Sequence, residues 1–407
     1  DPHTAEAARL LALPMAPGVA LKDLRDSVQE AGALDRVVLK FLGIPLELNA
    51  YYNILRTLGV GGYRDQQLAE SLAVDYGDLH FTCFQYAYDW RRDLVESAQG
   101  LDRFIKAKEA EVQQEISQRF GITRSPVKFD LVAHSMGSLV ARYYLRYGGA
   151  DLPEDGSLPP LTWEGAQHVD HLVVIGPPNA GSLESLTILV DGLKPSPLLA
   201  TYPPAIVGTL PSVYQLLPRS RHQPLLDVNG QPVQDVMDPL LWEQHGWGLA
   251  DPAQAEVLEQ LLPEVTDPQE RRNVALDHQR KVLNRAKHFT AALDVPAAPP
   301  PRTRLLLVAG DSMPTMSAAT LQTDGRLKIV SHAPGDGVVL RRSALMDERN
   351  EKMLGSRLTS PVHWSQVLFI FSDHLGMTMD PAFVDNILYF LLESPRMDSG
   401  RLGFNAL

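Results

Sequence analysis

The segment FDLVAHSMGSLVARYYLRYGG, residues 129–149, decides how this chain folds. It opens with the apolar run FDLVAH, which is typical of a buried β-strand, and it continues with apolar residues at the spacing of one helix face. Those helix-face residues are Leu139, Val140, Tyr143 and Tyr144. The sequence therefore predicts a strand that turns directly into a helix at Ser135.

The predicted turn has the form of a nucleophile elbow, with A-H-S-M-G in place of the usual G-x-S-x-G. Such a turn holds the Ser135 hydroxyl clear of the sheet and directs the backbone N–H of Met136 toward an oxyanion. Small residues are expected at Ala133 and Gly137 because backbone crowds backbone there. A serine that only caps a helix is the alternative, but the combined strand and helix patterns favour a nucleophile. The side chain of His134 is expected to point away from Ser135, into the core or a pocket.

A serine hydroxyl is a weak nucleophile unless a histidine accepts its proton and a carboxylate orients the imidazole. We predict His374 as this base, because it follows the apolar run QVLFIF (366–371) and precedes the last helical segment. His332 and His363 are the alternatives, although His332 ends an apolar run where a structural histidine is commoner. Asp373 is interpreted as a loop or helix-capping carboxylate.

The carboxylate of the predicted triad is Asp336, in a glycine-flanked turn after the run LKIVSH (327–332). A carboxylate at the carboxyl end of a strand would face the elbow, and the chain order is then Ser, Asp, His. Asp311, which follows the run TRLLLVAG (303–310), is the alternative acid.

Short β-branched runs alternate with longer segments of helical spacing along much of the chain. Besides the runs quoted above, they include FTCFQY (81–86) and HLVVIG (171–176). This alternation predicts an α/β fold with a mainly parallel sheet and helices on both faces, and the continuously apolar runs suit strands buried on both sides. Two amphipathic helices are predicted over residues 92–118 and 381–393.

The alternation stops between Leu183 and Arg302, where the sequence is first proline-rich and then helical over residues 273–293. A stretch of this length without strands, closed by the stiff connector VPAAPPPRT, predicts an inserted cap or lid. The expected domains are a core of residues 1–182 and 303–407, with a cap subdomain of residues 183–302.

Composition restricts the classes of partner. The chain has 37 Lys and Arg against 49 Asp and Glu, a formal net charge of −12. An acidic surface repels phosphate backbones and anionic lipid, so no nucleic-acid partner is expected. The single cysteine, Cys83, forms no internal disulfide, which favours a cytoplasmic protein but is compatible with a secreted or periplasmic one. No apolar run is long enough to span a bilayer.

Two weaker motifs are not expected to bind a cofactor. The sequence HVDH (168–171) has two histidines three residues apart, but it enters an apolar strand and no third ligand lies nearby. The glycines of GVGGY (59–63) lack the lysine and the following helix of a phosphate loop, so a turn is predicted. We expect neither a metal nor a cofactor.

Several blocks in the same order resemble the lecithin:cholesterol acyltransferase family of α/β-hydrolases, which includes phospholipid:diacylglycerol acyltransferases and lysosomal phospholipase A2. The resemblance covers roughly residues 50–393. The blocks are NILRTLGVGGYRDQQL, FQYAYDWR, AHSMGSLVARYYL, VVIGPPNAGS, AGDSMPT, PGDGVV and SDHLGMTMDPAFVDNIL. The resemblance implies an α/β-hydrolase fold.

Carried over by position, the resemblance implies Ser135 as nucleophile, Asp336 as acid and His374 as general base. It also implies a lipid or other acyl-ester substrate, which a serine hydrolase would cleave through an acyl-enzyme, or whose acyl group an O-acyltransferase would move to an alcohol. A non-catalytic lipid- or partner-binding relative is the third possibility. The implied cap would contact a membrane or lipid interface transiently. Apolar residues that could face lipid are Leu186, Ile188, Leu189, Leu198, Leu199 and Tyr202, for which packing within the cap is the alternative.

The sequence departs from the family at three points. Ala133 replaces the first glycine of the elbow, and Val338 stands where the family tends to have threonine after the acidic turn, so Asp336 is expected to lack one hydrogen bond. The glycine-rich turn of type P-G-x-x-G-S, which supplies the second oxyanion N–H, is not found. Because the opening DPHTAEAARL resembles sequence that follows this turn, we expect the numbered chain to begin downstream of it.

Overall fold

The computed structural model describes residues 5–28, 37–41, 44–48, 52–67, 80–123, 126–194, 201–349 and 358–393. Four parallel strands form the central sheet in the order β3-β4-β6-β9. They are β3 (Phe129–His134), β4 (Val169–Ile175), β6 (Arg304–Gly310) and β9 (Gln366–Ile370). The predicted mainly parallel α/β sheet is therefore confirmed, and these four strands coincide with four of the predicted apolar runs.

The register aligns the carboxyl ends of the four strands. His134 lies opposite Ile175, Ile175 opposite Val308, and Val308 opposite Leu368. Residues that follow the strands therefore meet along one edge of the sheet, where the loops of parallel α/β folds place their functional groups.

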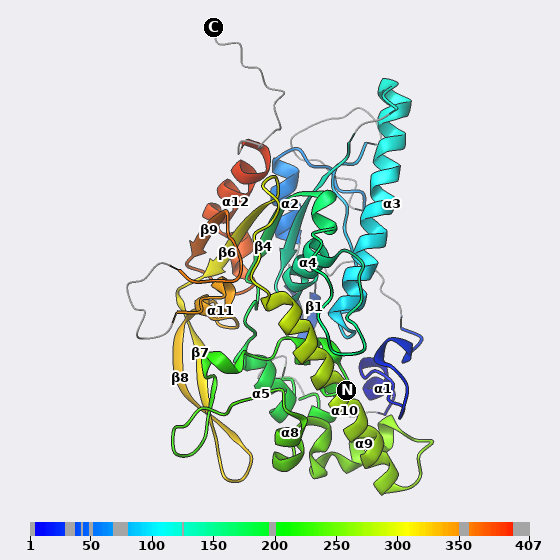
Figure 1. Cartoon of the computed structure of the whole chain (residues 1–407), viewed down its shortest axis with the longest axis vertical. Coiled ribbons are helices and arrows are strands. Elements are labelled where there is room, and N and C mark those ends of the chain that lie inside the picture. Colours follow the sequence, from blue (N-terminus) through cyan, green and yellow to red (C-terminus); the bar gives the residue numbers. More distant parts are fainter. Residues whose placement is uncertain are drawn as a thin grey trace.

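Both faces of the sheet are covered by helices (Figure 1). Alternate residues of β4 and β6, such as Val174 and Leu307, pack with α3 (Leu94–Phe120) and α4 (Met136–Tyr147). Their neighbours Val173 and Leu306 pack on the opposite face. The helices on that face are α2 (Tyr52–Val60) and α12 (Pro381–Leu388). Because both faces are buried, the strands are apolar without alternation.

Both helices predicted from amphipathic spacing are present. The predicted helix 92–118 is α3, which follows the N-cap Asp93 and ends before Gly121 in the left-handed conformation. The predicted helix 381–393 is α12, continued by one π-helical segment over Tyr389–Glu393.

Helices dominate the stretch from Leu183 to Asp294. They are α5 (Leu183–Asp191), α6 (Pro204–Val207), α7 (Pro211–Gln215), α8 (Pro239–His245), α9 (Ala255–Leu261) and α10 (Pro268–Asp294). In Figure 1, α5, α8, α9 and much of α10 lie together beyond one end of the central sheet. The expectation of no strand in this stretch was wrong at one point, because the two-residue strand β5 (Leu225–Leu226) pairs with β7 (Met313–Leu321).

The run LKIVSH was wrongly assigned to the central sheet. It forms β8 (Leu327–Gly335), which pairs antiparallel with β7 in a separate sheet of order β5-β7-β8. The chain leaves β6 at Gly310, enters β7 at Met313 and returns through β8, so a hairpin stands where a helical crossover was expected. Much of β8 is exposed, which explains why its apolar residues do not indicate a doubly buried strand.

The run FTCFQY was also wrongly predicted as a strand. In the described part of the chain, its backbone makes a single β-bridge, between Asp65 and Cys83, and no ladder of strand hydrogen bonds. Its aromatic rings pack sideways instead: Phe84 meets Phe129 edge-on at 6.4 Å between ring centroids, and the ring of Tyr86 lies 5.3 Å from that of Phe104.

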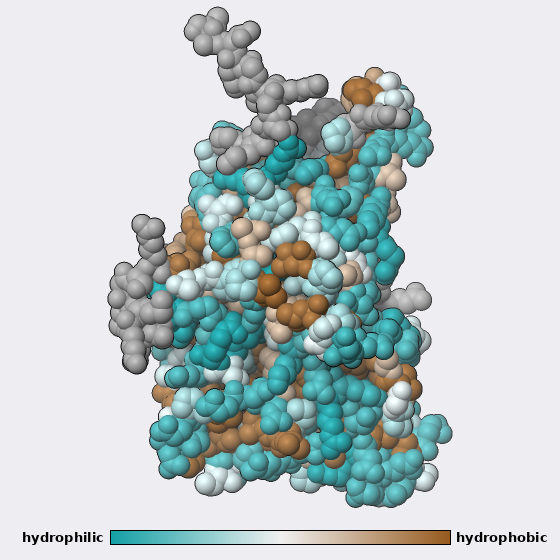
Figure 2. Space-filling model, viewed as in Figure 1, coloured by the Kyte–Doolittle hydropathy of each residue, from teal (hydrophilic) through white to brown (hydrophobic). Residues whose placement is uncertain are grey.

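The remaining elements are short. They are α1 (Ala5–Leu11), α11 (Arg341–Leu345), the antiparallel pair β1 (Val37–Phe41) and β2 (Ile44–Leu48), and the 3₁₀ turns Leu21–Asp23, Gly165–Gln167, Ser220–His222, Gly248–Ala250, Pro252–Gln254 and Gly376–Met379. Figure 2 shows hydrophilic residues over most of one face, with hydrophobic residues in small groups between them. Among the helices described, none has both the length and the apolar character that crossing a bilayer requires.

Candidate active site

Ser135 lies in a strained turn between β3 and α4. Its backbone has φ 53° and ψ −126°, a conformation that residues with a side chain rarely adopt. The turn is held because the N–H of Ser135 donates to the oxygen of Ile175 at 2.8 Å. Although Ser135 precedes α4, its side chain makes no capping hydrogen bond to the helix. The capping alternative therefore has no support, and the geometry is that of the predicted elbow.

Beyond its own helix and its chain neighbours, Gly137 has ordinary space around it. A Cβ atom at this position would meet only the hydroxyl of Tyr88, at 3.6 Å, which is an ordinary van der Waals contact. Met136 is the first residue of α4, so its amide has no acceptor within the helix. The positive φ of Ser135 distinguishes this turn.

Three predicted residues come together at the elbow. The Nε2 atom of His374 lies 2.9 Å from the Oγ of Ser135, and its Nδ1 atom lies 2.8 Å from the Oδ2 of Asp336. An ionised carboxylate only accepts, so Nδ1–H donates to Asp336 and Nε2 is left to accept the hydrogen of Ser135. Ser135 and His374 remain partly exposed, whereas Asp336 is buried.

The buried carboxylate of Asp336 is satisfied by main-chain donors. Its Oδ1 atom accepts the N–H groups of Val338 at 2.9 Å and Val339 at 2.6 Å. The side chain of Val338 offers Asp336 no hydrogen bond, as expected, but the main-chain N–H groups of Val338 and Val339 satisfy the carboxylate. These bonds hold the carboxylate in place, with its Oδ2 atom toward Nδ1 of His374.

Two glycines make room for the acid and the base. At Gly310, the last residue of β6, a Cβ atom would lie 2.4 Å from the Cβ of Asp336. At Gly176, which follows β4 with φ 54°, a Cβ atom would lie 3.1 Å from two atoms of the His374 ring. Sequence reasoning did not single out either glycine. The signal was present, because each stands where an apolar strand reaches its carboxyl end.

His134 lies in the core, as predicted, and also contacts the base. It is 6% exposed, and its Nε2 atom lies 2.9 Å from the main-chain oxygen of His374. A carbonyl oxygen only accepts, so this nitrogen carries the hydrogen. Burial, reinforced by the nearby His374, lowers the pKa of His134 from 6.5 to about 4, which keeps the ring neutral. His134 therefore links the end of β3 to the backbone of the loop that carries the base.

The alternative acids and bases lie in other settings. Asp311 forms an ion pair with Arg341 at 2.8 Å, and the Oδ1 atom of Asp373 accepts the N–H groups of two residues in its own loop. His332 is exposed on β8, and His363 is exposed in the segment before β9. The expected loop role of Asp373 is confirmed.

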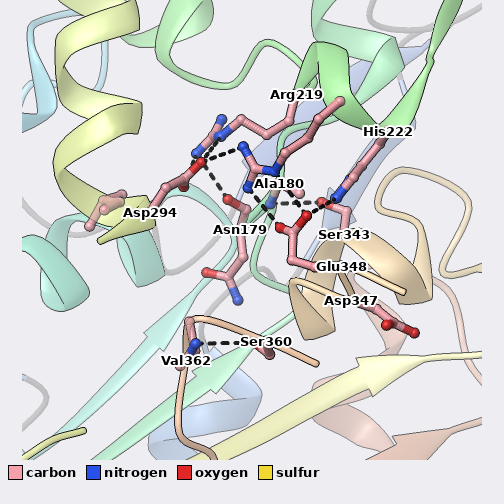
Figure 3. Close-up of polar contacts among 12 residues, drawn as sticks. Asn179, Ala180, Arg219, His222, Asp294, Ser343, Asp347, Glu348, Ser360 and Val362 are labelled. Atoms are coloured by element: carbon pink, nitrogen blue, oxygen red, sulfur yellow. Dashed lines mark hydrogen bonds and ion pairs between the residues drawn. The ribbon is translucent and has the colours of Figure 1, made fainter. Parts of the chain in front are cut away.

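A polar network connects the loop after β4 with α11 and with the end of α10 (Figure 3). The loop after β4 contacts the α11 region through Asn179, whose Nδ2 donates to Ala344 at 2.6 Å, and through the amide of Ala180, which donates to the hydroxyl of Ser343 at 3.1 Å. Arg219 bridges the same loop to the end of α10, because its guanidinium donates to the oxygen of Asn179 and to both carboxylate oxygens of Asp294.

The two weaker motifs have structural contacts. His168 lies 2.8 Å from Glu109, and His171 lies 2.6 Å from Asp130, so each imidazole of HVDH contacts a different carboxylate. Across the described residues, no group of three or more His, Cys, Asp or Glu is arranged to hold a metal ion. The glycines of GVGGY end α2 in a turn, as predicted, with Gly62 at φ 88°.

The apolar residues considered as lipid-facing divide into two groups. Leu186 and Leu189 are fully buried and pack within a hydrophobic cluster with helices α7, α8 and α10, so the packing alternative is correct for them. Ile188 and Tyr202 are partly buried against the same cluster. Leu198 and Leu199 lie outside the described residues.

Comparison with known proteins bears on the family. The family model described as "Lecithin:cholesterol acyltransferase" matches residues 73–242. Over these residues the chain is similar to the lecithin:cholesterol acyltransferase family, and its mainly parallel α/β sheet fits an α/β-hydrolase fold. The match contains the elbow but neither Asp336 nor His374, and it is shorter than the range 50–393 suggested by the sequence blocks.

Other comparisons add less. None of the curated proteins matches the sequence of this chain. A solved structure titled "The crystal structure of Tle4-Tli4 complex" contains a chain that is 16% identical, with a TM-score of 0.49, over 95% of this chain and 78% of that chain.

Proposed function

We propose that this protein is a serine hydrolase of lipid-like carboxylic esters that works through an acyl-enzyme. The observation that carries the proposal is the continuous chain of contacts from Ser135 Oγ through His374 to Asp336, at 2.9 and 2.8 Å. A strained backbone at a serine is typical of a nucleophile elbow, and a serine with only a structural role does not require it. The family match supports an enzyme that acts on lipid esters, as hydrolase or acyltransferase.

In the proposed mechanism, His374 removes the proton of Ser135 as the oxygen attacks the ester carbonyl, and Asp336 stabilises the resulting imidazolium. The amide of Met136 donates to the oxyanion. His374 then protonates the leaving alcohol, the acyl-enzyme forms, and water deprotonated by the same imidazole releases the acid. His134 holds the backbone of His374 during both steps through its hydrogen bond of 2.9 Å.

An apolar setting next to the base supports a lipid-like acyl group. Three large apolar side chains of the base-bearing loop are exposed, namely Phe371 at 81%, Leu375 at 43% and Met379 at 61%. Exposed apolar side chains beside a polar reactive group suit a substrate with a long acyl chain. We further propose that residues 183–302 act as the cap, because many of their buried side chains form hydrophobic clusters with β7 and with the N-terminal residues Leu13 and Met15, apart from the central sheet.

The test is ester turnover by variants of two neighbouring serines. Ser135→Ala should lower kcat by roughly 10⁴-fold or more, because the nucleophile is lost. Ser138→Ala is the matched control: this serine is also in the first turn of α4, but its hydroxyl donates to the oxygen of Ala133 at 3.0 Å. Ser138→Ala should keep most of the activity. A Ser135→Ala enzyme with wild-type turnover would remove the proposal.

Acyl transfer is the second candidate, favoured by the description of the matching family. The two activities differ only in whether water or an alcohol reaches the acyl-enzyme. Product analysis of the wild-type protein with and without an added alcohol acceptor separates them. Free acid as the main product at high acceptor concentration supports the hydrolase, and a new ester as the main product supports the transferase.

A further inference from the structure

Two arginines of α4 are buried, although arginine is among the residue types that are least often buried. Arg142 is 2% exposed and Arg146 is 3% exposed. They stand four residues apart, so their side chains leave the same face of the helix one turn apart. The helix offers them no solvent-facing side, since every residue from Ser138 to Tyr147 is buried. Two positive charges are therefore enclosed together in the protein.

The hydrogen bonds of these two guanidinium groups go to uncharged acceptors. Arg142 donates to the side-chain oxygen of Asn179 at 2.7 Å and to the main-chain oxygen of Leu293 at 3.1 Å. Arg146 donates to the main-chain oxygen of Val295. The two carbonyl groups lie at the end of α10, whose partial negative charge compensates a cation only in part. The Nε atom of Arg146 is buried and has no hydrogen-bond partner among the described residues, so a charged donor is left over.

The nearby carboxylate of Asp294 is engaged by other cations. It forms ion pairs with Arg219 at 2.9 Å, which Figure 3 shows, and with Arg221 at 2.7 Å. Within the part of the chain that the structure describes, neither Arg142 nor Arg146 forms an ion pair. Burial, together with repulsion by Arg146 and Arg219, lowers the pKa of Arg142 to about 9, so this group is still charged at neutral pH. A buried charge of this kind is costly unless a counter-ion compensates it.

A small cavity lies against both guanidinium groups. Besides Arg142 and Arg146, its walls include Trp163, Leu305, Val362 and His363. Its polar side chains are all able to donate hydrogen bonds, and only His363 could also accept one. Because His363 is exposed, the cavity has access to solvent. It has room for a group of about the size of a water molecule. A small cavity surrounded by donors and by two positive charges suits a small anion.

The wall formed by Trp163 is strained. This residue has φ 55°, which is unusual for a bulky side chain. Its N–H donates to the main-chain oxygen of Arg146 at 2.8 Å, and the guanidinium carbon of Arg146 lies 5.4 Å from the ring centroid. Strain of this kind persists where the surrounding contacts over-determine a site. Trp163 therefore holds the Arg146 guanidinium beside the cavity.

We propose that Arg142 and Arg146 bind a small inorganic anion of the size of chloride in this cavity, and that the bound anion joins α4 to the end of α10. A phosphate group is too large for the available space. Leu305 stands near the amino end of β6, whereas the triad lies at the carboxyl ends of the strands, so the anion site is separate from the triad. The inference does not depend on the proposed hydrolase function.

Thermal unfolding tests the site, with sodium chloride replacing sodium methanesulfonate at constant ionic strength. Methanesulfonate has the same charge as chloride but is too large for the cavity. The Tm of the wild-type protein should rise by roughly 2 °C between about 1 and 100 mM chloride, because a ligand that binds only the folded state stabilises it. Arg146→Met removes the charge and keeps a flexible apolar stem, so its Tm should not respond. Arg280→Met is the matched control: it removes a surface charge that is paired with Glu243, and it should respond as the wild type does.

Bromide locates the anion without any variant. Crystals of the wild-type protein soaked in sodium bromide should give an anomalous peak between the guanidinium groups of Arg142 and Arg146. The proposal is overturned if chloride leaves the wild-type Tm unchanged, or if it raises the Tm of Arg146→Met as much as that of the wild type. Should Arg146→Met fail to fold, the bromide data decide, and no peak in this cavity would overturn the site. None of these measurements uses ester hydrolysis, so their outcome is independent of the proposed function.

Discussion

Ser135 occupies a backbone conformation that costs free energy, on the order of 1–3 kcal/mol for a residue with a side chain at positive φ. The surrounding contacts maintain it, because its N–H is bonded to Ile175 and its hydroxyl meets His374. Asp336, at the other end of the triad, is also held by its surroundings. One carboxylate oxygen accepts two main-chain N–H groups, and the other contacts the imidazole of His374.

Substitution of the two candidate acids distinguishes their roles. Asp336→Asn should lower kcat by roughly 10³- to 10⁴-fold, because an amide favours the wrong imidazole tautomer. Asp311→Asn should lower kcat less than tenfold, roughly, since it loses only a partly exposed ion pair with Arg341. Steady-state kinetics on one ester check both. Full activity in Asp336→Asn with loss in Asp311→Asn would show that the acid is Asp311.

At the scale of elements, the acid is delivered by the hairpin of β7 and β8. This hairpin leaves β6 after Gly310 and returns Asp336 to a position beside the same glycine. The base arrives differently, in the loop after the edge strand β9. Gly310 is therefore the point at which the central sheet and the hairpin set the position of the carboxylate.

Gly310→Ala tests this contact. The added methyl group would lie 2.4 Å from the Cβ and 2.9 Å from the Cα of Asp336, so the acidic turn must shift. We expect kcat to fall by roughly a hundredfold, because small displacements of a catalytic group are expensive. Gly156→Ala is the control, since this glycine has φ 78° but open space around it, and the variant should lose some thermal stability without losing kcat. Unchanged kcat in Gly310→Ala would contradict the account.

The sequence predicted elements best where one local signal decided them. The elbow was predictable because a strand, a serine and a helix follow one another within residues 129–149, and the four central strands because they are continuously apolar. The β7–β8 hairpin was not predictable, because an apolar run does not reveal which backbone pairs with it. The strand predicted for FTCFQY was wrong for the same reason. The contact between His134 and the backbone of His374 was not predictable either, because it joins residues 240 positions apart.

At the scale of the whole molecule, polar contacts as well as apolar packing hold the helical stretch together. At the end of α10, the carboxylate of Asp294 forms ion pairs with Arg219 and Arg221. Within α10, the Nε2 atom of His278 lies 3.0 Å from the oxygen of Thr209, in the segment between α6 and α7. Burial lowers the pKa of His278 from 6.5 to about 4, the same shift as at His134.

These two histidines make the folded state sensitive to acid. Because the folded pKa is lower than the unfolded one, the unfolded chain binds more protons between about pH 6.5 and pH 4, and the free energy of unfolding falls as the pH falls through this window. His278→Gln keeps an N–H for Thr209 but does not titrate, so its loss of stability between pH 7 and pH 5 should be smaller than that of wild type by about 1–2 kcal/mol. Urea denaturation at both values measures this. Identical losses in the two proteins would contradict the assignment.

The most direct test of the account is covalent labelling of the wild-type protein with a serine-directed alkyl phosphonate, followed by peptide mass spectrometry. The account predicts one label per chain, on Ser135, with labelling suppressed in His374→Ala and retained in Ser138→Ala. A label on another residue, or wild-type protein that stays unlabelled while native by circular dichroism, would contradict the claim that Ser135 is an activated nucleophile.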